Sequence, residues 1–442
     1  MKVCLISLGC DKNLVDNEKM GGLLRDAGHE MTDSEAEAEA IIINTCCFIH
    51  DAKEESIRTI IETADYKKTG KLKRLVITGC LVERYADEIR SELPEVDAVV
   101  GTTAYEEIVK AIESKDYEVL KRDLSYLPDP DAARLISAGN YVSHLKIAEG
   151  CDKCCTYCII PKIRGPYRSV PMERLLKEAE YLANAGTKEL ILVAQETTLY
   201  GVDLYGHKAL PELLTKLCRI DGIVRIRVLY CYPEEITDEL IEVMKNEPKI
   251  CRYLDLPIQH ASDPILRKMG RRTTRKDLEA LIRKLRKELP GITLRTTLIT
   301  GFPGETEEDY KELSSFAGRM KFNRLGVFPY SPEEGTADEK MPGRVPKRVK
   351  ERRRNEIMRL QRDICKEYGK KCIGKVFDVL VDGVLPEEGV TVGRTYMDAP
   401  GIDGLVYFTA GRELLSGDLV RVKITGAKEY DLMGEMVYES AE

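Results

Sequence analysis

The sequence predicts a multidomain α/β protein with an N-terminal parallel α/β domain, a central partial or full (β/α) barrel and a C-terminal small β-barrel. The first observation is that short apolar runs alternate with helix-like polar stretches over most of the chain, as in βα repeats. The second is that the last part carries short strand-like runs between Gly, Asp and Pro turns. The third is the length of 442 residues, 43% of them hydrophobic, which is enough for roughly three domains of ~150 residues each.

The N-terminal domain is expected over residues 1–135. Its buried parallel strands are predicted from four apolar runs, KVCLISLG, AIIINT, RLVITG and AVV, which are separated by polar, helix-like segments. A connector is expected in the stretch YLPDPDAAR, which has two prolines and no hydrophobic periodicity.

The central barrel is expected over residues 136–370. Its strands are predicted in YVSHLKIAEG, ELILVAQET, VRIRVLY, YLDLPIQ, TLRTTLITGFPG and RLGVFPYSP. A helix such as SVPMERLLKEAEYLANAG has proline near its start and glycine just past its end. In a barrel of this kind the chemistry lies at the carboxyl ends of the strands.

The last domain, residues 371–442, is predicted to be a small β-barrel of the OB type, with strands in VFDVLVDG, GLVYFTA and DLVRVKITGAKEYDLMGEMVYE. It is acidic, because residues 376–442 contain 13 acidic and 5 basic side chains, whereas the whole chain has a net charge of only −7. Just upstream, GRVPKRVKERRRNEIMRLQRDICKEYGKK is a basic helix-like stretch. Such a run is typical of a solvated helix face, and it also offers a candidate surface for secondary RNA contact.

The protein is expected in the cytoplasm and away from membranes, because the sequence shows no leader with a cleavage site and no apolar stretch of membrane-spanning length. In that reducing compartment the 14 cysteines favour metal binding or thiol chemistry over disulfides.

Four cysteines lie close together in the segment EGCDKCCTYCIIPKIRG. Cys151, Cys155 and Cys158 form a C-x3-C-x2-C pattern directly after the first predicted barrel strand, whereas Cys154 is an adjacent bystander. Three thiolates from one short loop suit an iron–sulfur cluster, which prefers soft ligands and tolerates one iron without a protein ligand. The alternative of a zinc knuckle is weaker, because zinc usually takes four ligands and no His or Cys follows closely in the sequence.

A second set of cysteines follows the predicted strands of the N-terminal domain. Cys10, Cys46 and Cys80 each come after one apolar run. Taken singly, each is more often a small buried hydrophobe, but the carboxyl ends of parallel strands share one edge of a sheet, so the three can converge on one cluster. Cys47 competes with Cys46, and the apolar runs do not choose between them. The other cysteines have no partner at ligand spacing and are expected to pack in the core: Cys4, Cys218, Cys231, Cys251, Cys365 and Cys372.

The cysteine loop at the start of a (β/α) barrel resembles the radical S-adenosylmethionine (SAM) superfamily. In that family the open iron binds SAM, and an electron delivered through the cluster generates a 5′-deoxyadenosyl radical. The resemblance implies SAM contacts at Gln195, Glu196 and Thr197 in VAQETTLYG and at Gly301 and Gly304 in LITGFPGET, together with the aromatic Tyr157 beside the last cluster cysteine.

These positions also have simpler explanations. A carboxylate after a strand, as at Glu196, can be a helix N-cap, and the Gly-Pro-Gly stretch can be a tight turn. In LDLPIQHAS, Gln259 and His260 lie at another strand end, where a single histidine is more often a hydrogen-bonded scaffold residue than an acid or base.

Two sets of three cysteines followed by a small β-barrel resemble the methylthiotransferases over essentially the whole chain. That family joins an N-terminal auxiliary-cluster domain, a radical SAM barrel and a C-terminal TRAM domain. The stretches SLGCDKNLVDNE, in place of the GCQMN pattern of tRNA-modifying relatives, QETTLYG, LPIQHASDPILRKMGR and GRTYMDAPGIDG match the RimO-type branch. The Asn-Thr-Cys pattern of the family favours Cys46 over Cys47, and Glu196 stands where aspartate is more usual.

The resemblance implies insertion of a –SCH3 group at the β-carbon of an aspartate in ribosomal protein twelve of the small subunit. It implies two [4Fe-4S] clusters, with one SAM as methyl donor and a second as radical source, an electron donor such as flavodoxin or ferredoxin, and a sulfur source. The acidic tail favours a basic protein substrate over a phosphate backbone. The alternatives are a tRNA adenosine methylthiotransferase and a non-catalytic iron–sulfur electron carrier, which would leave the SAM-site motifs unexplained.

Overall fold

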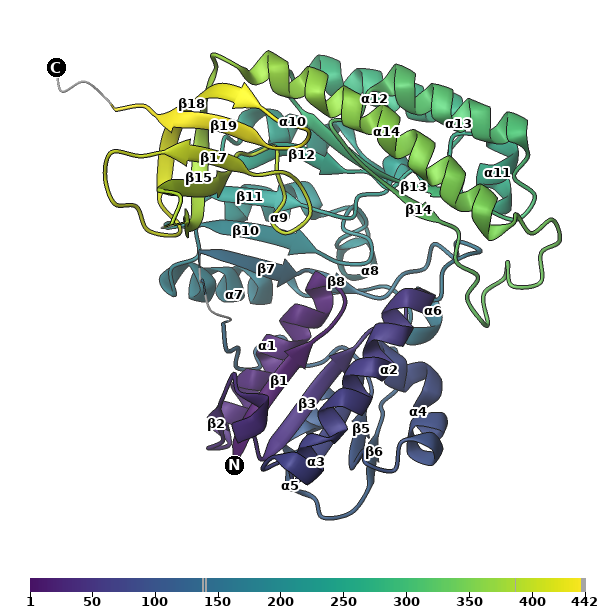
Figure 1. Ribbon diagram of the computed structural model, residues 1–442, viewed down its shortest axis with the longest axis vertical. Coiled ribbons are helices and arrows are strands. Elements are labelled where there is room, and N and C mark those ends of the chain that lie inside the picture. The colour runs from purple at the N-terminus through teal and green to yellow at the C-terminus, as the bar shows by residue number, and fades with distance from the viewer. Residues whose placement is uncertain (137–138, 140, 386, 439–442) are drawn as a thin grey trace.

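The computed structural model describes residues 1–136, 139, 141–385 and 387–438 and consists of two parallel sheets and one closed barrel (Figure 1). The N-terminal domain lies below the central sheet in this view, and the C-terminal barrel lies against the opposite end of the central domain. The predicted fold class is confirmed in all three parts. None of the described helices is long and apolar enough to cross a bilayer.

The N-terminal sheet has six parallel strands in the order β2-β1-β3-β4-β5-β6. The central strands β3 and β4 are buried along their whole length, which explains their continuous apolar sequence. The two-residue β2 and the three-residue β6 at the edges were not predicted. The strands are β1 (Lys2–Ser7), β2 (Glu30–Met31), β3 (Ala40–Thr45), β4 (Arg74–Gly79), β5 (Ala98–Val100) and β6 (Glu118–Leu120).

Helices cover both faces of this sheet. One apolar cluster joins α1 and α5 to one face, and a second joins α2 and α4 to the other. The helical segments are α1 (Asp11–Asp26), η1 (Glu35–Glu37), α2 (His50–Ala64), α3 (Tyr66–Thr69), α4 (Cys80–Glu92), η2 (Tyr105–Glu107) and α5 (Ile108–Glu113).

The central sheet has six parallel strands in the order β7-β10-β11-β12-β13-β14 and does not close, so the predicted barrel is a partial one. All six strands were predicted. They are β7 (Val142–Lys146), β10 (Glu189–Val193), β11 (Arg225–Val228), β12 (Ile250–Asp255), β13 (Thr293–Thr300) and β14 (Arg324–Pro329); a short antiparallel pair, β8 (Ala148–Glu149) and β9 (Arg168–Ser169), lies beside them.

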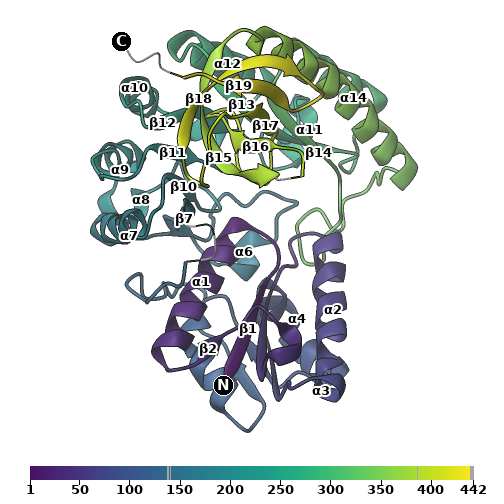
Figure 2. The same cartoon turned by 60° about the vertical axis from the view of Figure 1, so that its left-hand side comes forward.

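The helices of the central domain form an arc around the outside of this sheet (Figure 2). Two of them, which start after Thr274 and Thr306, begin with capping boxes. In each box the threonine side chain accepts from a backbone N–H of the first turn, and an aspartate side chain accepts from the N–H of the threonine. The helical segments are α6 (Ile160–Ile163), α7 (Met172–Asn184), α8 (Val202–Tyr205), α9 (Leu210–Leu217), η3 (Pro233–Glu235), α10 (Asp238–Asn246), α11 (Asp263–Lys268), α12 (Arg275–Glu288), α13 (Glu307–Met320) and α14 (Lys347–Cys372).

The C-terminal domain is a closed five-stranded barrel in the order β15-β16-β17-β19-β18. Its strands are antiparallel neighbours except for β17 and β19, which run parallel. Strand β16 was not predicted. The strands are β15 (Val376–Leu385), β16 (Val390–Arg394), β17 (Val406–Thr409), β18 (Leu419–Ala427) and β19 (Leu432–Met436).

The stretch GRTYMDAPGIDG of the C-terminal barrel packs against the inner face of the central sheet. Arg394 Nη1 lies 2.7 Å from Glu189 Oε2, and the Tyr253 hydroxyl donates to Asp403 Oδ2 at 2.7 Å. Asp398 of the same loop pairs with an arginine of β14. Glu189 and this arginine, Arg324, are the first residues of β10 and β14, so at these two strands the loop contacts the amino-terminal end of the sheet.

The predicted connector contains no helix or strand in its described residues, yet it is firmly packed. Arg134 is buried and donates to Glu18 Oε2 at 2.8 Å and to Glu178 Oε1 at 2.7 Å, so that it joins α1 to α7. The connector also packs directly on Gly22 of α1, where an added Cβ would lie only 2.2 Å from the carbonyl oxygen of Ala133. The connector therefore helps to fix the N-terminal domain against the central one.

Candidate functional site

The three N-terminal cysteines lie at one edge of the first sheet. Cys10 follows β1 and is the N-cap of α1, Cys46 follows β3, and Cys80 is the first residue of α4 after β4. Strands β1, β3 and β4 are neighbours in this order, so their carboxyl ends place the three thiols side by side.

Two glycines allow these loops to approach one another. Gly9 has φ +90°, and a Cβ on it would lie 2.7 Å from the Cβ of Cys46. Gly79 has φ +94°, and its Cβ would lie 2.4 Å from Asn44 Oδ1. Side chains would be both strained and obstructed there. Burial first, and then the other cysteines of the set, raise the pKa of the Cys46 and Cys80 thiols.

Cys47 is oriented differently from its neighbour. Its thiol donates to the carbonyl of Cys80 at 3.2 Å, and it belongs to the apolar cluster beneath α2 and α4. Cys46, in contrast, lies against Gly9 beside Cys10. Of the two, Cys46 therefore has its thiol on the side of the other two strand ends.

The second cysteine set lies in the loop between β8 and α6. Cys151 and Cys155 are buried, Cys158 is half-buried, and the bystander Cys154 is exposed. Gly150 has φ +78°, and a Cβ on it would lie 2.1 Å from the carbonyl oxygen of Pro166. Burial raises the pKa of Cys151 to about 12. The loop is thus tightly folded, and Cys155 and Cys151 lie close enough to Cys158 to contribute, after burial, to the raised pKa of its thiol.

The predicted SAM-contact residues after β10 lie beside this loop. Glu196 is fully buried; its Oε1 accepts from the backbone N–H of Thr198 at 2.8 Å, whereas its Oε2 has no hydrogen-bond partner among the described residues. Burial raises the pKa of Glu196 to about 7. The residue does not cap a helix, because α8 has Gly201 as its N-cap. A buried acceptor without a partner points to a missing donor.

The neighbouring side chains of this stretch are bound to the scaffold. Gln195 donates through Nε2 to Glu149 Oε1 at 2.6 Å, while its own Oε1 is buried without a partner among the described residues. Thr197 donates through Oγ1 to the carbonyl of Leu229 at 2.8 Å. Tyr157 packs against the apolar cluster around Phe302.

Backbone strain concentrates near these strand ends. Cys154, Tyr230 and Gln259 are three of the four non-glycine residues with positive φ among the described residues, at +52°, +59° and +69°. Such residues cost about 1–3 kcal/mol each and cluster at functional sites. Tyr230 is held by its N–H, which donates to Asp255 Oδ2 at 3.2 Å.

The remaining predicted positions are mostly structural. The Gln259 backbone pairs with β13 through Thr297. His260 is fully buried and accepts from the Ser262 N–H at 2.9 Å through Nδ1, which makes it a hydrogen-bonded scaffold residue as expected. Its Nε2 lies 3.3 Å from Glu305 and has no hydrogen-bond partner among the described residues.

The two glycines of LITGFPGET are covered by lysine side chains. A Cβ on Gly301 would lie 2.2 Å from Cγ of Lys350, and one on Gly304 would lie 2.4 Å from Nζ of Lys268. Their backbone therefore packs closely on α14 and α11, and a SAM contact at either glycine stays a prediction.

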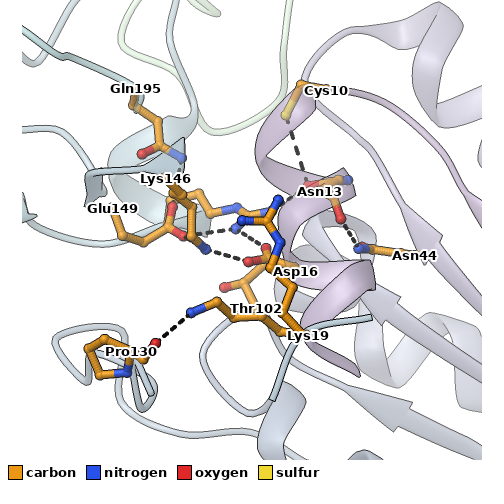
Figure 3. A network of polar contacts seen from close by, with 12 residues as sticks. Cys10, Asn13, Asp16, Lys19, Asn44, Thr102, Pro130, Lys146, Glu149 and Gln195 are labelled. Atoms are coloured by element: carbon orange, nitrogen blue, oxygen red, sulfur yellow. Dashed lines mark hydrogen bonds and ion pairs between the residues drawn. The ribbon is translucent and has the colours of Figure 1, made fainter. Parts of the chain in front are cut away.

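A buried polar network lies between the first turns of α1, which begins after Cys10, and Glu149, which precedes the Cys151 loop (Figure 3). Arg164, 1% exposed, pairs through Nη1 with Asp16 Oδ2 at 2.8 Å and with Glu149 Oε2 at 3.1 Å, and its Nη2 donates to Asn13 Oδ1. Lys146 Nζ lies 2.8 Å from Glu149 Oε2 and also pairs with Asp16. Asp16 and Asn13 belong to α1, which begins after Cys10, whereas Glu149 precedes the Cys151 loop by two residues. The network therefore joins the helix that begins beside one cysteine set to the strand that precedes the other.

The donor chemistry of both sets suits iron–sulfur clusters. No group of three His, Cys, Asp or Glu side chains in the described part of the chain is arranged around a single metal ion. A [4Fe-4S] cluster makes a different demand, because each cysteine binds its own iron at a corner of the cluster. In both sets, three thiols are spread over one loop or one sheet edge with no histidine or carboxylate among them, so each thiol can bind a different iron of a cluster.

Comparison with known proteins decides the family. A protein from Lachnoclostridium phytofermentans named ribosomal protein uS12 methylthiotransferase RimO is 59% identical over 438 residues, which cover 98% of this chain and 99% of the relative. A protein of the same name from Pelotomaculum thermopropionicum is 51% identical and covers 99% of both chains. This chain belongs to the RimO family.

Family profiles and a solved structure agree with the domain order of a RimO-family protein. The profiles are described as uncharacterized protein family UPF0004 (residues 2–101), radical SAM superfamily (145–317) and TRAM domain (373–437). The radical SAM methyltransferase TsrM from Kitasatospora setae, solved with cobalamin and a [4Fe-4S] cluster, shares the fold with a TM-score of 0.56 at 16% identity, covering 76% of this chain and 74% of TsrM. The protein is a radical SAM methylthiotransferase with iron–sulfur clusters and SAM as cofactors.

Proposed function

We propose that this RimO-family protein inserts a methylthio group at the β-carbon of an aspartate in ribosomal protein uS12, the twelfth protein of the small subunit. Its relatives of 47–59% identity carry this substrate in their names, which favours it over tRNA. The observation that carries the proposal is the junction of the two cysteine sets through Arg164, because one substrate carbon must be reached from both.

The two sets are assigned to two [4Fe-4S] clusters. Cys151, Cys155 and Cys158 hold the cluster of the central domain; the strand-end set of Cys10, Cys46 and Cys80 holds the auxiliary cluster, and Cys47 is a packing residue. When bound, the clusters and two SAM molecules supply the electron, the radical, the methyl group and a site for the incoming sulfur.

The residues of the chain bind and orient these groups. The unpaired oxygens of Glu196 and Gln195 can accept hydrogen bonds from the ammonium or hydroxyl groups of SAM. Gln195 is joined to Glu149, which lies two residues before Cys151. Thr197 fixes this stretch to Leu229, and Tyr157 packs behind the cluster loop. Gly301 and Gly304 belong to the same proposed site with weaker geometric support.

The C-terminal barrel is the proposed docking surface for uS12. Ribosomal proteins are typically basic, and the barrel carries exposed carboxylates together with exposed apolar side chains such as Leu415, which is 71% exposed. Complementary charge increases the rate of association and excludes phosphate backbones. The barrel is held rigidly by Arg394 and Asp403 against the catalytic sheet, so docking there fixes the position of the substrate loop.

The remaining partners follow from the chemistry and the charge. We place the reaction in the cytoplasm, with an electron donor such as flavodoxin or ferredoxin and a separate sulfur source. The exposed cations of α14, such as Arg348 and Arg359, offer a secondary RNA contact, although others on this helix pair with glutamates. Residues 1–135, 136–370 and 371–442 are the corresponding auxiliary-cluster, radical SAM and TRAM-like units.

Mass spectrometry tests the proposal after anaerobic reconstitution with iron, sulfide, SAM and a strong reductant. Ribosomal protein uS12 and unmodified tRNA are offered in parallel. The expected product is uS12 with a methylthio group on one aspartate. Methylthio-adenosine in tRNA with unmodified uS12 would overturn the proposal, and SAM cleavage with neither product would mean that the substrate is a different one.

A further inference from the structure

Lys12 is a buried cation without an acidic partner. It lies in the first turn of α1, two residues after Cys10, and is 5% exposed. No ion pair joins it to a carboxylate within the described ranges. Its Nζ instead lies 3.3 Å from the ring centroid of Tyr230. A cation–π contact offsets only part of the cost of removing an ammonium group from water.

Four other cations near the strands are paired with carboxylates. Lys146 and Arg164 share Asp16 and Glu149. Two further cations pair in the same way: Lys153 with Glu234 and Glu235, and Arg295 with Asp255 and Asp403. Lys12 therefore differs from these four cations, because no ion pair joins it to a carboxylate of the described residues.

The acidic groups nearest to Lys12 in the sequence have other partners. Asp11 accepts from the Tyr230 hydroxyl at 3.4 Å and lies 3.7 Å from His144 Nε2. Asp11 is electrostatically close to Lys12, but no ion pair joins the two within the described residues. The carboxylate of a ligand would give the buried ammonium group an ion pair.

The position of Lys12 places that anion between the two proposed clusters. Tyr230, under the ammonium group, follows β11, and its carbonyl accepts from the N–H of Thr197 in the proposed SAM stretch. On the other side, Lys12 is in the turn that begins at Cys10. A ligand bound to Lys12 would thus lie beside both the auxiliary set and the carboxyl ends of the central strands.

We infer that Lys12 binds the side-chain carboxylate of the substrate aspartate and selects an acidic residue for modification. This inference rests on the proposed function. The carboxylate carbon is bonded directly to the β-carbon, so a cation that holds the carboxylate fixes the reacting carbon as well. Lys12 is a positioning and specificity residue in this role, and no proton transfer is required of it.

The test compares binding of two forms of uS12 to the reconstituted, full-length protein. One form has the target aspartate and the other has asparagine in its place. Wild type is expected to bind the asparagine form about 10-fold more weakly or worse, because a charged hydrogen bond is lost. Lys12→Met is expected to bind both forms equally, with the affinity that wild type has for the asparagine form.

Three controls keep the test decisive. Lys371→Met removes another lysine that lies over a tyrosine ring, because its Nζ is 5.5 Å from the ring centroid of Tyr368 on α14. This variant should prefer the aspartate form of uS12 as strongly as wild type does. Iron content and the KM for SAM are measured for every variant, because an increase confined to the KM for SAM in Lys12→Met would mean that the lysine binds the carboxylate of SAM instead. Lys12→Arg keeps the charge and should preserve the preference for aspartate.

The possible failures are distinguishable. If Lys12→Met prefers the aspartate form as strongly as wild type does, the inference is wrong while the proposed function stands. If Lys12→Met does not retain iron, the comparison moves to wild type, where equal affinity for the two forms overturns the inference. If wild type prefers the aspartate form, Lys12→Met does not, and no methylthio product forms, the proposed function is wrong and the binding role of Lys12 stands.

Discussion

Replacing Arg164 by methionine is expected to lower the free energy of unfolding by about 3–5 kcal/mol, the cost of leaving buried charges unpaired. The side chain is 1% exposed and pairs with Asp16 and Glu149, whose side chains are each 5% exposed. These two carboxylates share two cations, Arg164 and Lys146. Without Arg164, two buried carboxylates are left with one ammonium group.

Neutralising one carboxylate should restore part of the loss. In Arg164→Met/Asp16→Asn, the pair of Lys146 and Glu149 at 2.8 Å remains as a balanced unit. The double variant should therefore be less destabilised than the sum of the two single variants. The matched control is Arg219→Met, which removes an ion pair of 2.7 Å to Glu247 from a side chain that is 70% exposed and should cost ~0–1 kcal/mol.

Urea unfolding of the cluster-free protein under reducing conditions provides the assay, with the transition of the two packed domains followed by circular dichroism. A loss for Arg164→Met no larger than that of Arg219→Met would mean that the buried charges do not depend on Arg164. Strict additivity in the double variant would mean that Arg164 and Asp16 do not interact.

Three more outcomes follow from the geometry. Burial raises the pKa of Glu196 from 4.5 to about 7, so the folded protein keeps this proton to a higher pH than the unfolded chain does. From pH 5 to 7, wild type should therefore lose stability relative to Glu196→Gln by up to about 1.4 kcal/mol per pH unit. Urea unfolding at both pH values measures this difference, and an equal change in stability of the two proteins would contradict it. Gly9→Ala should remove about half of the iron on reconstitution, because the new Cβ would lie 2.7 Å from the Cβ of Cys46. The matched control is Gly28→Ala, which has a similar φ of +86° but no atom within 4 Å of its Cβ and should keep all of the iron. Cys46→Ser should also lose half of the iron while Cys47→Ser retains it; the reverse result in an iron assay would reassign the auxiliary ligand.

The sequence was sufficient to predict the positions of both cysteine sets. Cys10, Cys46 and Cys80 each follow an apolar run, and parallel strands bring such positions together whatever the loops do. The run ELILVAQET likewise predicted a strand with Gln195 and Glu196 at its end. These predictions needed only local patterns and one rule of topology.

The contacts between distant segments could not be predicted in this way. Arg164 binds Asp16 from 148 residues away, and no periodicity connects them. The stretch GRTYMDAPGIDG was informative only as a family resemblance, because its role depends on Arg394 reaching Glu189 in another domain. That no carboxylate of the described residues forms an ion pair with Lys12 is also invisible in sequence, since it depends on which carboxylates other cations bind.

The measurement that tests the account most directly is low-temperature EPR spectroscopy of the reduced, fully reconstituted protein. If the two cysteine sets hold clusters that face one substrate space, the spins of the reduced clusters should interact and split or broaden each other's signals. The interaction should disappear in Cys46→Ser, which leaves the cluster of the Cys151 loop alone. A wild-type spectrum equal to the simple sum of two single-cluster variants would contradict a shared site.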